Sequence, residues 1–309
     1  MVDVVVIINA FNNVDLNHVV ESLRNIGITH EPIRIVLSWS NPPPNAPSIV
    51  NSLKEALGNA FDITYLPLPK MGSGKQRDLA LRFVLAGFPN TRYIVYMEDD
   101  VVIRDRGWLN RLIEIFDKLP SRVAAISLEP GSRLCVDFVV TNIVTDRGLY
   151  VGLSGGSGVY IIRADVLREL LSLGIGTYSP FMYFHWEDME FALKLWFMGY
   201  VTVSYRGINY IHLGATSRLR PLHRRYTEYL GPLMAMLINA PTSFLVMGFL
   251  VRIFRDVVRA IVNNDLLLLF RAYYFLVKNL RYIMAHRALR VRIYKDQSIF
   301  AKIYYAKIY

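Results

Sequence analysis

Short apolar runs rich in valine and isoleucine alternate with helical patterns along the first two thirds of this 309-residue chain. Continuous apolar runs of this kind are typical of strands that are buried on both faces of a sheet. The alternation predicts an α/β fold with a Rossmann-like, mostly parallel central sheet flanked by helices, whose ligands bind beyond the carboxyl ends of the strands. The predicted strands are 4–8, 33–37, 63–66, 93–97, 123–127, 136–140, a glycine-rich strand within 150–162, and 201–205. The predicted helices are 16–26, 49–57, 76–86, 165–173 and 188–197.

Two acidic clusters stand where such a sheet would bring them together. Glu98-Asp99-Asp100 follows the apolar run 93–97, and Trp186-Glu187-Asp188-Met189-Glu190 opens the helical pattern about 90 residues later. Paired carboxylates can hold a divalent cation on a diphosphate while another acid accepts a proton. Each cluster also has a structural interpretation, as a polar strand end or as acids in the first turn of a helix, where the macrodipole favours them by roughly 0.3–1 kcal/mol each.

Five segments carry a more specific pattern: Ile7-Ile8-Asn9-Ala10-Phe11-Asn12, Gly74-Lys75-Gln76-Arg77-Asp78, Glu98-Asp99-Asp100, Trp186-Glu187-Asp188-Met189-Glu190 and His212-Leu213-Gly214-Ala215-Thr216-Ser217. In this order they resemble the family-two inverting glycosyltransferases of the GT-A fold. The resemblance covers about residues 2–220. It implies a hexosyltransferase-type enzyme of polysaccharide or glycolipid biosynthesis. Such an enzyme moves a sugar from a nucleoside-diphosphate donor to an acceptor hydroxyl with inversion, with Mg²⁺ or Mn²⁺ as cofactor.

The resemblance also implies a role for individual residues. Asp188 matches the general base, Asp100 and His212 match the metal site, and the donor-binding positions are Asn9, Phe11, Arg77 and Asp99. Trp186 and Glu187, beside the base, and Gly156, in the glycine-rich segment, are candidate contacts of the acceptor or the donor sugar. Taken alone, Arg77 would be a solvated helix charge and His212 a structural histidine.

Two positions depart from the family pattern. Many relatives carry an acid after the second strand that contacts the nucleobase, whereas this chain has Ser38-Trp39-Ser40-Asn41 and then three prolines, which leaves the nucleotide open. Glu98 stands where an aspartate is common, and its longer side chain reaches a metal differently. The segment Gly72-Ser73-Gly74-Lys75 lacks the spacing of a phosphate-binding loop, so we do not expect an ATPase.

The C-terminal third differs from the rest in charge. Up to His212 the chain has 19 Lys+Arg and 21 Asp+Glu, and from Leu213 onward it has 16 and 4. The uncharged run 231–251 is close to the ~20 residues that cross a bilayer, but two prolines and an asparagine interrupt it. Arginines then alternate with apolar residues, as in a basic amphipathic helix.

We therefore predict a catalytic domain over 1–220 and a helical, basic and apolar extension over 221–309. The extension would dock on a membrane surface, and nucleic acid is the less favoured partner. The alternatives are an interface between copies in a homo-oligomer and a helical cover on the core.

The expected cellular compartment rests on two sequence features, the cysteine content and the first apolar run. The lone Cys135 cannot form an internal disulfide, and the run 4–8 lacks the basic leader of a secretory signal. We expect a cytoplasmic protein, peripheral on the cytoplasmic face of the membrane, with a lipid-linked molecule as one candidate acceptor. The competing functions are a catalytically inactive nucleotide-sugar-binding protein and a basic protein that binds membrane or nucleic acid.

Overall fold

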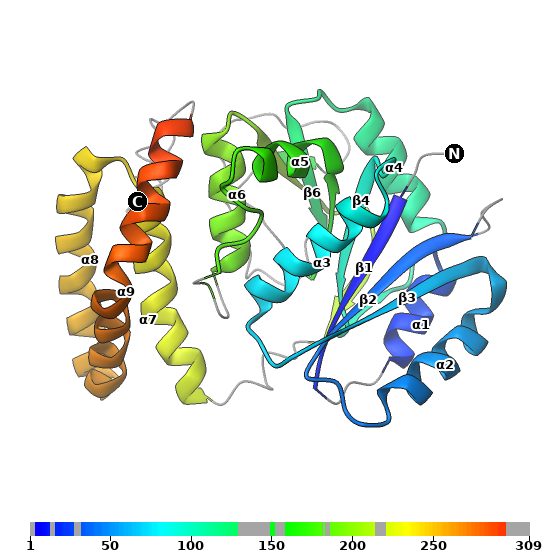
Figure 1. Cartoon of the computed structure of the whole chain (residues 1–309), viewed down its shortest axis with the longest axis horizontal. Coiled ribbons are helices and arrows are strands. Elements are labelled where there is room, and N and C mark those ends of the chain that lie inside the picture. The colour runs from blue at the N-terminus through cyan, green and yellow to red at the C-terminus, as the bar shows by residue number, and fades with distance from the viewer. Residues whose placement is uncertain are drawn as a thin grey trace.

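An eight-stranded sheet of order β3-β2-β1-β4-β8-β6-β9-β7 organises the first part of the chain (Figure 1). The computed structural model describes residues 4–12, 16–27, 32–128, 149–151, 158–180, 182, 186–213 and 221–294. The strands are β1 (Val4–Phe11), β2 (Ile33–Ser40), β3 (Phe61–Leu68), β4 (Tyr93–Glu98), β6 (Val123–Leu128), β7 (Leu149–Val151), β8 (Val159–Arg163) and β9 (Val201–Tyr205). The predicted strand 136–140 lies outside the described residues, and the predicted segment 150–162 contains parts of two strands, β7 and β8.

The sheet is mostly parallel, as predicted. Strands β3, β2, β1 and β4 pair in parallel, and so do β6 and β9. Strand β8 lies between β4 and β6 and is antiparallel to both, and the short β7 is antiparallel to β9. The carboxyl ends of β1, β2 and β4 therefore lie at one edge of the sheet, and the register pairs Asn9 of β1 with Glu98 of β4.

Helices connect and flank these strands. They are α1 (Asn17–Arg24), α2 (Ala46–Leu57) with the short η1 (Gly58–Ala60), α3 (Ser73–Gly87), α4 (Trp108–Lys118), α5 (Ala164–Ser172) and α6 (Glu187–Phe197). Parallel strands are joined by right-handed crossovers. The chain moves from β1 to β3 in one direction and then returns past β1 to β4, so α1 and α2 cover one face and α3 the other (Figure 1).

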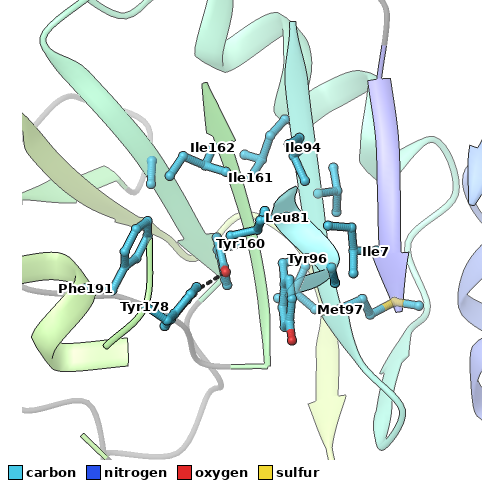
Figure 2. Close-up of a cluster of buried hydrophobic side chains, with 14 of the residues drawn as sticks. Ile7, Leu81, Ile94, Tyr96, Met97, Tyr160, Ile161, Ile162, Tyr178 and Phe191 are labelled. Carbon is cyan, nitrogen blue, oxygen red and sulfur yellow. Dashed lines mark hydrogen bonds between the residues drawn. The ribbon is translucent and has the colours of Figure 1, made fainter. Parts of the chain in front are cut away.

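The core becomes aromatic toward the carboxyl edge (Figure 2). Aliphatic residues such as Ile94 and Ile161 fill its middle. The Tyr96 and Tyr160 rings then stack with centroids 5.0 Å apart, and Tyr178 stacks on Phe191 at 4.6 Å. The hydroxyls of Tyr160 and Tyr178 are hydrogen-bonded. These rings form the floor below the acidic residues.

A second, two-stranded sheet was not foreseen from the sequence. Strand β5 (Val101–Ile103) pairs antiparallel with β10 (Tyr210–His212), and Val101 is opposite His212. Because β5 directly follows Asp100, this pairing brings His212 back to the acidic end of β4.

The C-terminal region is helical, as predicted, and its described residues form three long helices: α7 (Pro221–Asn239), α8 (Thr242–Val262) and α9 (Leu266–Ile293). The uncharged run 231–251 is divided between α7 and α8, which meet at Ala240 and Pro241. No helix within the described ranges is long and apolar enough to cross a membrane. Figure 1 shows α8 and α9 on the side of the molecule away from the sheet, with α7 beside them and the C-terminal end of α9 next to α6.

Buried polar contacts join these helices to α6. Arg290 of α9 binds Glu190 of α6, and its Nη1 also donates to Asn239 Oδ1 at 3.0 Å. Lys194 Nζ lies 3.7 Å from Glu190 Oε2. Burial alone would raise the pKa of Glu190, but Arg290 and Lys194 hold this pKa below its ordinary value. The helices thus cover α6, in agreement with the alternative of a helical cover on the core, while a domain boundary at residue 220 stays a prediction.

Candidate active site at the carboxyl edge of the sheet

Three of the predicted donor-binding residues lie together where β1 and β4 end. The Asp99 backbone N–H donates to Asn9 O at 3.1 Å, and the Phe11 N–H donates to Asp99 Oδ2 at 3.3 Å. Asn9 is 3% exposed, and its Oδ1 accepts no hydrogen bond from any residue that the structure describes. A buried acceptor of this kind is costly unless something pairs with it, so Asn9 is suited to receive a donor group of a ligand.

Glu98, Asp100 and His212 form a cluster that could hold a metal ion. Each offers one ligand atom, and these atoms all lie within 4.8 Å of one another. His212 Nε2 lies 3.2 Å from Glu98 Oε2 and 3.3 Å from Asp100 Oδ1. Hydrogen bonds to Asp100 and Glu98 raise the pKa of His212 to about 10. Two carboxylate oxygens and an imidazole nitrogen are a suitable ligand set for a divalent cation, so the residues fit the predicted Mg²⁺ or Mn²⁺. Glu98 lies with the two predicted ligands, Asp100 and His212, although its side chain is longer than the aspartate that is common at this position.

Gly158 packs directly against this cluster. It has φ +77°, and a Cβ added to it would lie 2.8 Å from Val101 Cγ2 and 3.3 Å from His212 Nδ1. Its carbonyl accepts the Glu98 N–H at 2.8 Å. Only a glycine fits here without strain. This explains one glycine of the glycine-rich segment, whereas the predicted contact Gly156 lies outside the described residues.

Arg77 of α3 is buried beside Glu98, one of the three candidate metal ligands. Its guanidinium binds Glu98 and lies 3.9 Å from Glu187 Oε1. It also lies 4.8 Å from the centre of the Tyr96 ring and 5.6 Å from that of Tyr178. Burial alone would lower the pKa of Arg77, but the two tyrosines and two glutamates raise it well above its ordinary value. The observed partners are thus protein groups, and a contact from Arg77 to the nucleotide stays a prediction.

Asp188 lies in the first turn of α6 and is half-buried. Its Oδ1 accepts the Met189 N–H at 2.8 Å. Burial, with the negative charge of Glu187 next, raises the pKa of Asp188 to about 7, while Arg77 opposes the rise. A carboxylate with a pKa near neutrality can accept a proton efficiently.

Glu187 and Trp186 are held by neighbouring helices. Glu187 is buried and accepts a hydrogen bond from Ser73 Oγ at the start of α3. Trp186 has φ +68° and packs on α7, where a Cβ added to Gly231 would lie 2.8 Å from Trp186 Cδ1. Both contacts position α6, and an additional contact to an acceptor stays a prediction.

Sequence reasoning assigned no role to Gln76. Its Nε2 donates to Ala10 O at 3.1 Å and to Ser38 O at 2.8 Å, which ties α3 to the ends of β1 and β2. Gln76 is fully buried, and its Oε1 has no hydrogen-bond partner among the described residues. The signal was its place beside Arg77 in the segment that carries the family resemblance.

No protein-family profile matches the sequence. A comparison with curated proteins likewise finds no match. Solved structures do match: TarS of S. aureus at 12% identity and a TM-score of 0.50, over 77% of this chain and 40% of that one. A shorter piece of TarS matches at 14% identity and a TM-score of 0.50, over 77% of this chain and 66% of that one. GalNAc-T7, in complex with UDP, GalNAc and Mn²⁺, matches at 11% identity and a TM-score of 0.51, over 68% and 44%.

The chain thus spans less than two thirds of the length of each of these proteins. At such low identity the agreement concerns the fold alone. This protein has the GT-A fold of nucleotide-sugar-dependent glycosyltransferases.

Proposed function

We propose that this protein is a family-two inverting glycosyltransferase that moves a hexosyl group from a nucleoside-diphosphate sugar to an acceptor hydroxyl with the help of a divalent metal. The observation that carries the proposal is the convergence of Glu98, Asp100 and His212 at the carboxyl edge of a GT-A sheet. The match to GalNAc-T7, whose structure contains UDP, GalNAc and Mn²⁺, supports the classes of donor and metal.

The donor's nucleoside would bind at the ends of β1 and β4. Asp99 would accept hydrogen bonds from the ribose hydroxyls, while Asn9 and Phe11 would contact the base. The indole of Trp39 at the end of β2 does not face a bound base, because it is fully buried and its Nε1 donates to Asn12 O at 2.7 Å. The base would therefore be recognised chiefly by groups on β1 and β4.

Glu98, Asp100 and His212 would hold the cation on the donor's diphosphate. When bound, the cation supplies Lewis-acid stabilisation of the charge that develops on the leaving diphosphate. Mg²⁺ prefers an all-oxygen set with several waters, whereas an imidazole nitrogen suits a transition metal better. The ligand set therefore favours Mn²⁺ over Mg²⁺.

Asp188 would act as the general base. The proton of the acceptor hydroxyl passes to its carboxylate as the acceptor oxygen attacks the anomeric carbon. The bond from that carbon to the diphosphate oxygen breaks, and the diphosphate leaves with the electron pair. A single displacement inverts the anomeric centre and needs no protein nucleophile, and a positioned base typically contributes ~10²–10⁴-fold.

Arg77 and Glu187 would organise this machinery. Glu187 lies between Ser73 and Arg77, and Arg77 binds the metal-site carboxylate of Glu98. This chain of contacts links the helix that carries the base to the residues that would hold the metal. Trp186, which is half-buried beside the proposed base, would contact the acceptor sugar.

A thermal-shift screen of the full chain tests the proposal. The ligands are UDP-, GDP-, dTDP- and CMP-sugars with Mn²⁺, Mg²⁺ or EDTA, and the variant is Asp100→Ala. A ligand that binds only the native state raises its melting temperature. We expect one nucleotide class to stabilise the protein only with metal, and the shift to vanish in the variant.

A transfer assay distinguishes the proposed enzyme from its two alternatives, an inactive donor-binding protein and a protein without a donor site. Donor binding without transfer to any acceptor, and without donor hydrolysis, would identify a catalytically inactive binding protein. A protein that responds to no donor would lack the proposed site altogether.

A further inference from the structure

Helices α8 and α9 expose an unusually apolar outer surface, which we call the α8–α9 face. Its exposed fractions are large for big side chains: Phe254 73%, Phe270 69% and Val262 78%. The other members, all at least 44% exposed, are Val246, Met247, Leu250, Val251, Val258, Ile261, Leu267, Tyr274, Val277, Leu280 and Tyr282. Large apolar side chains exposed in such number on two neighbouring helices mark an interaction site.

The face is the outer side of a layer that is already packed. The inner sides of α8 and α9 hold buried residues, among them Ala260, Leu269 and Leu276. In Figure 1 the two helices lie at the edge of the molecule farthest from the sheet. The apolar residues of the α8–α9 face are thus not needed for packing α8 and α9 onto the rest of the protein.

The charges on the two helices have one sign. Exposed cations lie among the apolar residues: Arg255, Arg259, Arg271, Lys278, Arg281 and Arg292. The only acids of α8, α9 and the turn between them are Asp256 and Asp265, which are 1% and 5% exposed. Asp256 pairs with Arg252 and Asp265 with Arg225. Arg259 also pairs with Glu228 of α7. The exposed charges that α8 and α9 themselves contribute are therefore all positive.

This pattern selects one class of partner. A second copy of the same face would bring like charges together, which is destabilising. Nucleic acid would satisfy the cations but would leave the phenylalanines and aliphatic residues without a suitable surface. An anionic lipid surface satisfies both, because apolar side chains enter the boundary of the acyl chains while Arg and Lys meet the headgroups.

We infer that α8 and α9 lie along the surface of an anionic membrane and insert the α8–α9 face into it. This is interfacial binding, consistent with the finding that no described helix could span a bilayer.

Vesicle flotation of the full chain tests the inference. The vesicles are phosphatidylcholine alone, and phosphatidylcholine with phosphatidylserine in equal parts. We expect binding to the anionic vesicles, little binding to the neutral ones, and a decrease with salt because screening weakens surface charges. Binding is independent of sugar transfer, so its failure and the failure of the proposed function are distinguishable.

Matched variants identify the face. Phe254→Ser with Phe270→Ser should weaken binding at least about tenfold, as expected from the loss of two inserting aromatic side chains. Phe83→Ser, which removes an exposed phenylalanine of α3 outside the face, should leave binding unchanged. Arg271→Glu, Lys278→Glu and Arg281→Glu together should abolish the preference for anionic vesicles.

Three results would overturn the inference. The first is no binding to either vesicle. The second is equal loss of binding in the Phe83→Ser control. The third is a dimer in sedimentation that the Phe254→Ser and Phe270→Ser variant dissociates, which would assign the face to a second copy instead.

Discussion

The guanidinium of Arg290 in α9 binds the carboxylate of Glu190 in α6, and the two side chains are 1% and 0% exposed. Glu190 lies half a turn after Asp188 in the helix that begins at the candidate site. Removing one partner of a buried ion pair leaves a charge without compensation, at a cost of about 3–5 kcal/mol. Helix α9, the last helix that the structure describes, is therefore tied to the helix that carries the proposed base.

Arg290→Met should lower the free energy of unfolding by about 3–5 kcal/mol, because Glu190 loses its closest cation. Denaturant unfolding measures this change. Arg292→Met is the matched control, since Arg292 is exposed on the same helix and its replacement should change stability by no more than about 0.5 kcal/mol. Equal effects of the two variants would show that the pair contributes nothing specific.

Asp188→Asn should reduce kcat by about 10²–10⁴-fold while donor binding persists, because the amide cannot accept the acceptor's proton. Asp165→Asn is an informative control. Asp165 opens α5 and accepts the Val166 N–H at 2.8 Å, as Asp188 accepts the Met189 N–H in α6. If Asp188 only stabilises a helix terminus, both variants will keep full activity.

The rate of transfer should rise as pH increases through about 7, where Asp188 loses its proton. Glu187 raises the pKa of Asp188, so Glu187→Gln should lower that pKa and move the rise in kcat/KM to lower pH. The amide can still accept the Ser73 hydrogen bond, which preserves the contact between α3 and α6. If the rise in kcat/KM occurs at the same pH in Glu187→Gln as in the unaltered protein, the pH dependence does not report the ionisation of Asp188.

Gly74→Ala should be destabilising by about 1–3 kcal/mol, as for other overpacked sites. A Cβ on Gly74 would lie 2.5 Å from the Met182 carbonyl oxygen and 3.3 Å from that of Ser179, so α3 would have to move away from the backbone at these two residues, which precede α6. Gly87→Ala in the same helix meets nothing within 4 Å and should be neutral or slightly stabilising. Thermal unfolding of the two variants gives the comparison, and a similar melting temperature for both would contradict it.

The strands and the acidic edge could be predicted because they depend on local pattern. Apolar runs locate β1, β2 and β4, and parallel pairing alone places Asn9 beside Glu98 at their ends. The antiparallel direction of β8 could not be predicted, since an apolar run carries no direction. The partnership of His212 with Asp100 depends on β5 and β10, two strands of only three residues.

The contacts of individual side chains could be predicted from the sequence less well than the strands. The ion pair of Arg77 with Glu98 could not be predicted, because the two residues lie on different elements and Arg77 is positioned by packing against Tyr96 and Tyr178. A contact from Arg77 to a nucleotide stays a prediction. The uncharged run 231–251 lacks charge largely because its α7 part is buried, with Leu233, Met234 and Ile238 at 0% exposure. A hydropathy pattern does not distinguish burial in protein from burial in lipid.

The contact between Glu190 and Arg290 joins residues 100 positions apart in the sequence. At about 5–20 residues per second, a ribosome would take roughly 5–20 seconds to add Arg290 after Glu190. Throughout that interval α6 has an acid at its core-facing side and no cation from α9 to compensate it. Glu190, in the helix that bears the proposed base, therefore gains Arg290 only after α9 has been synthesised. A nascent chain that stops before α9 would carry Asp188 in a helix without this ion pair.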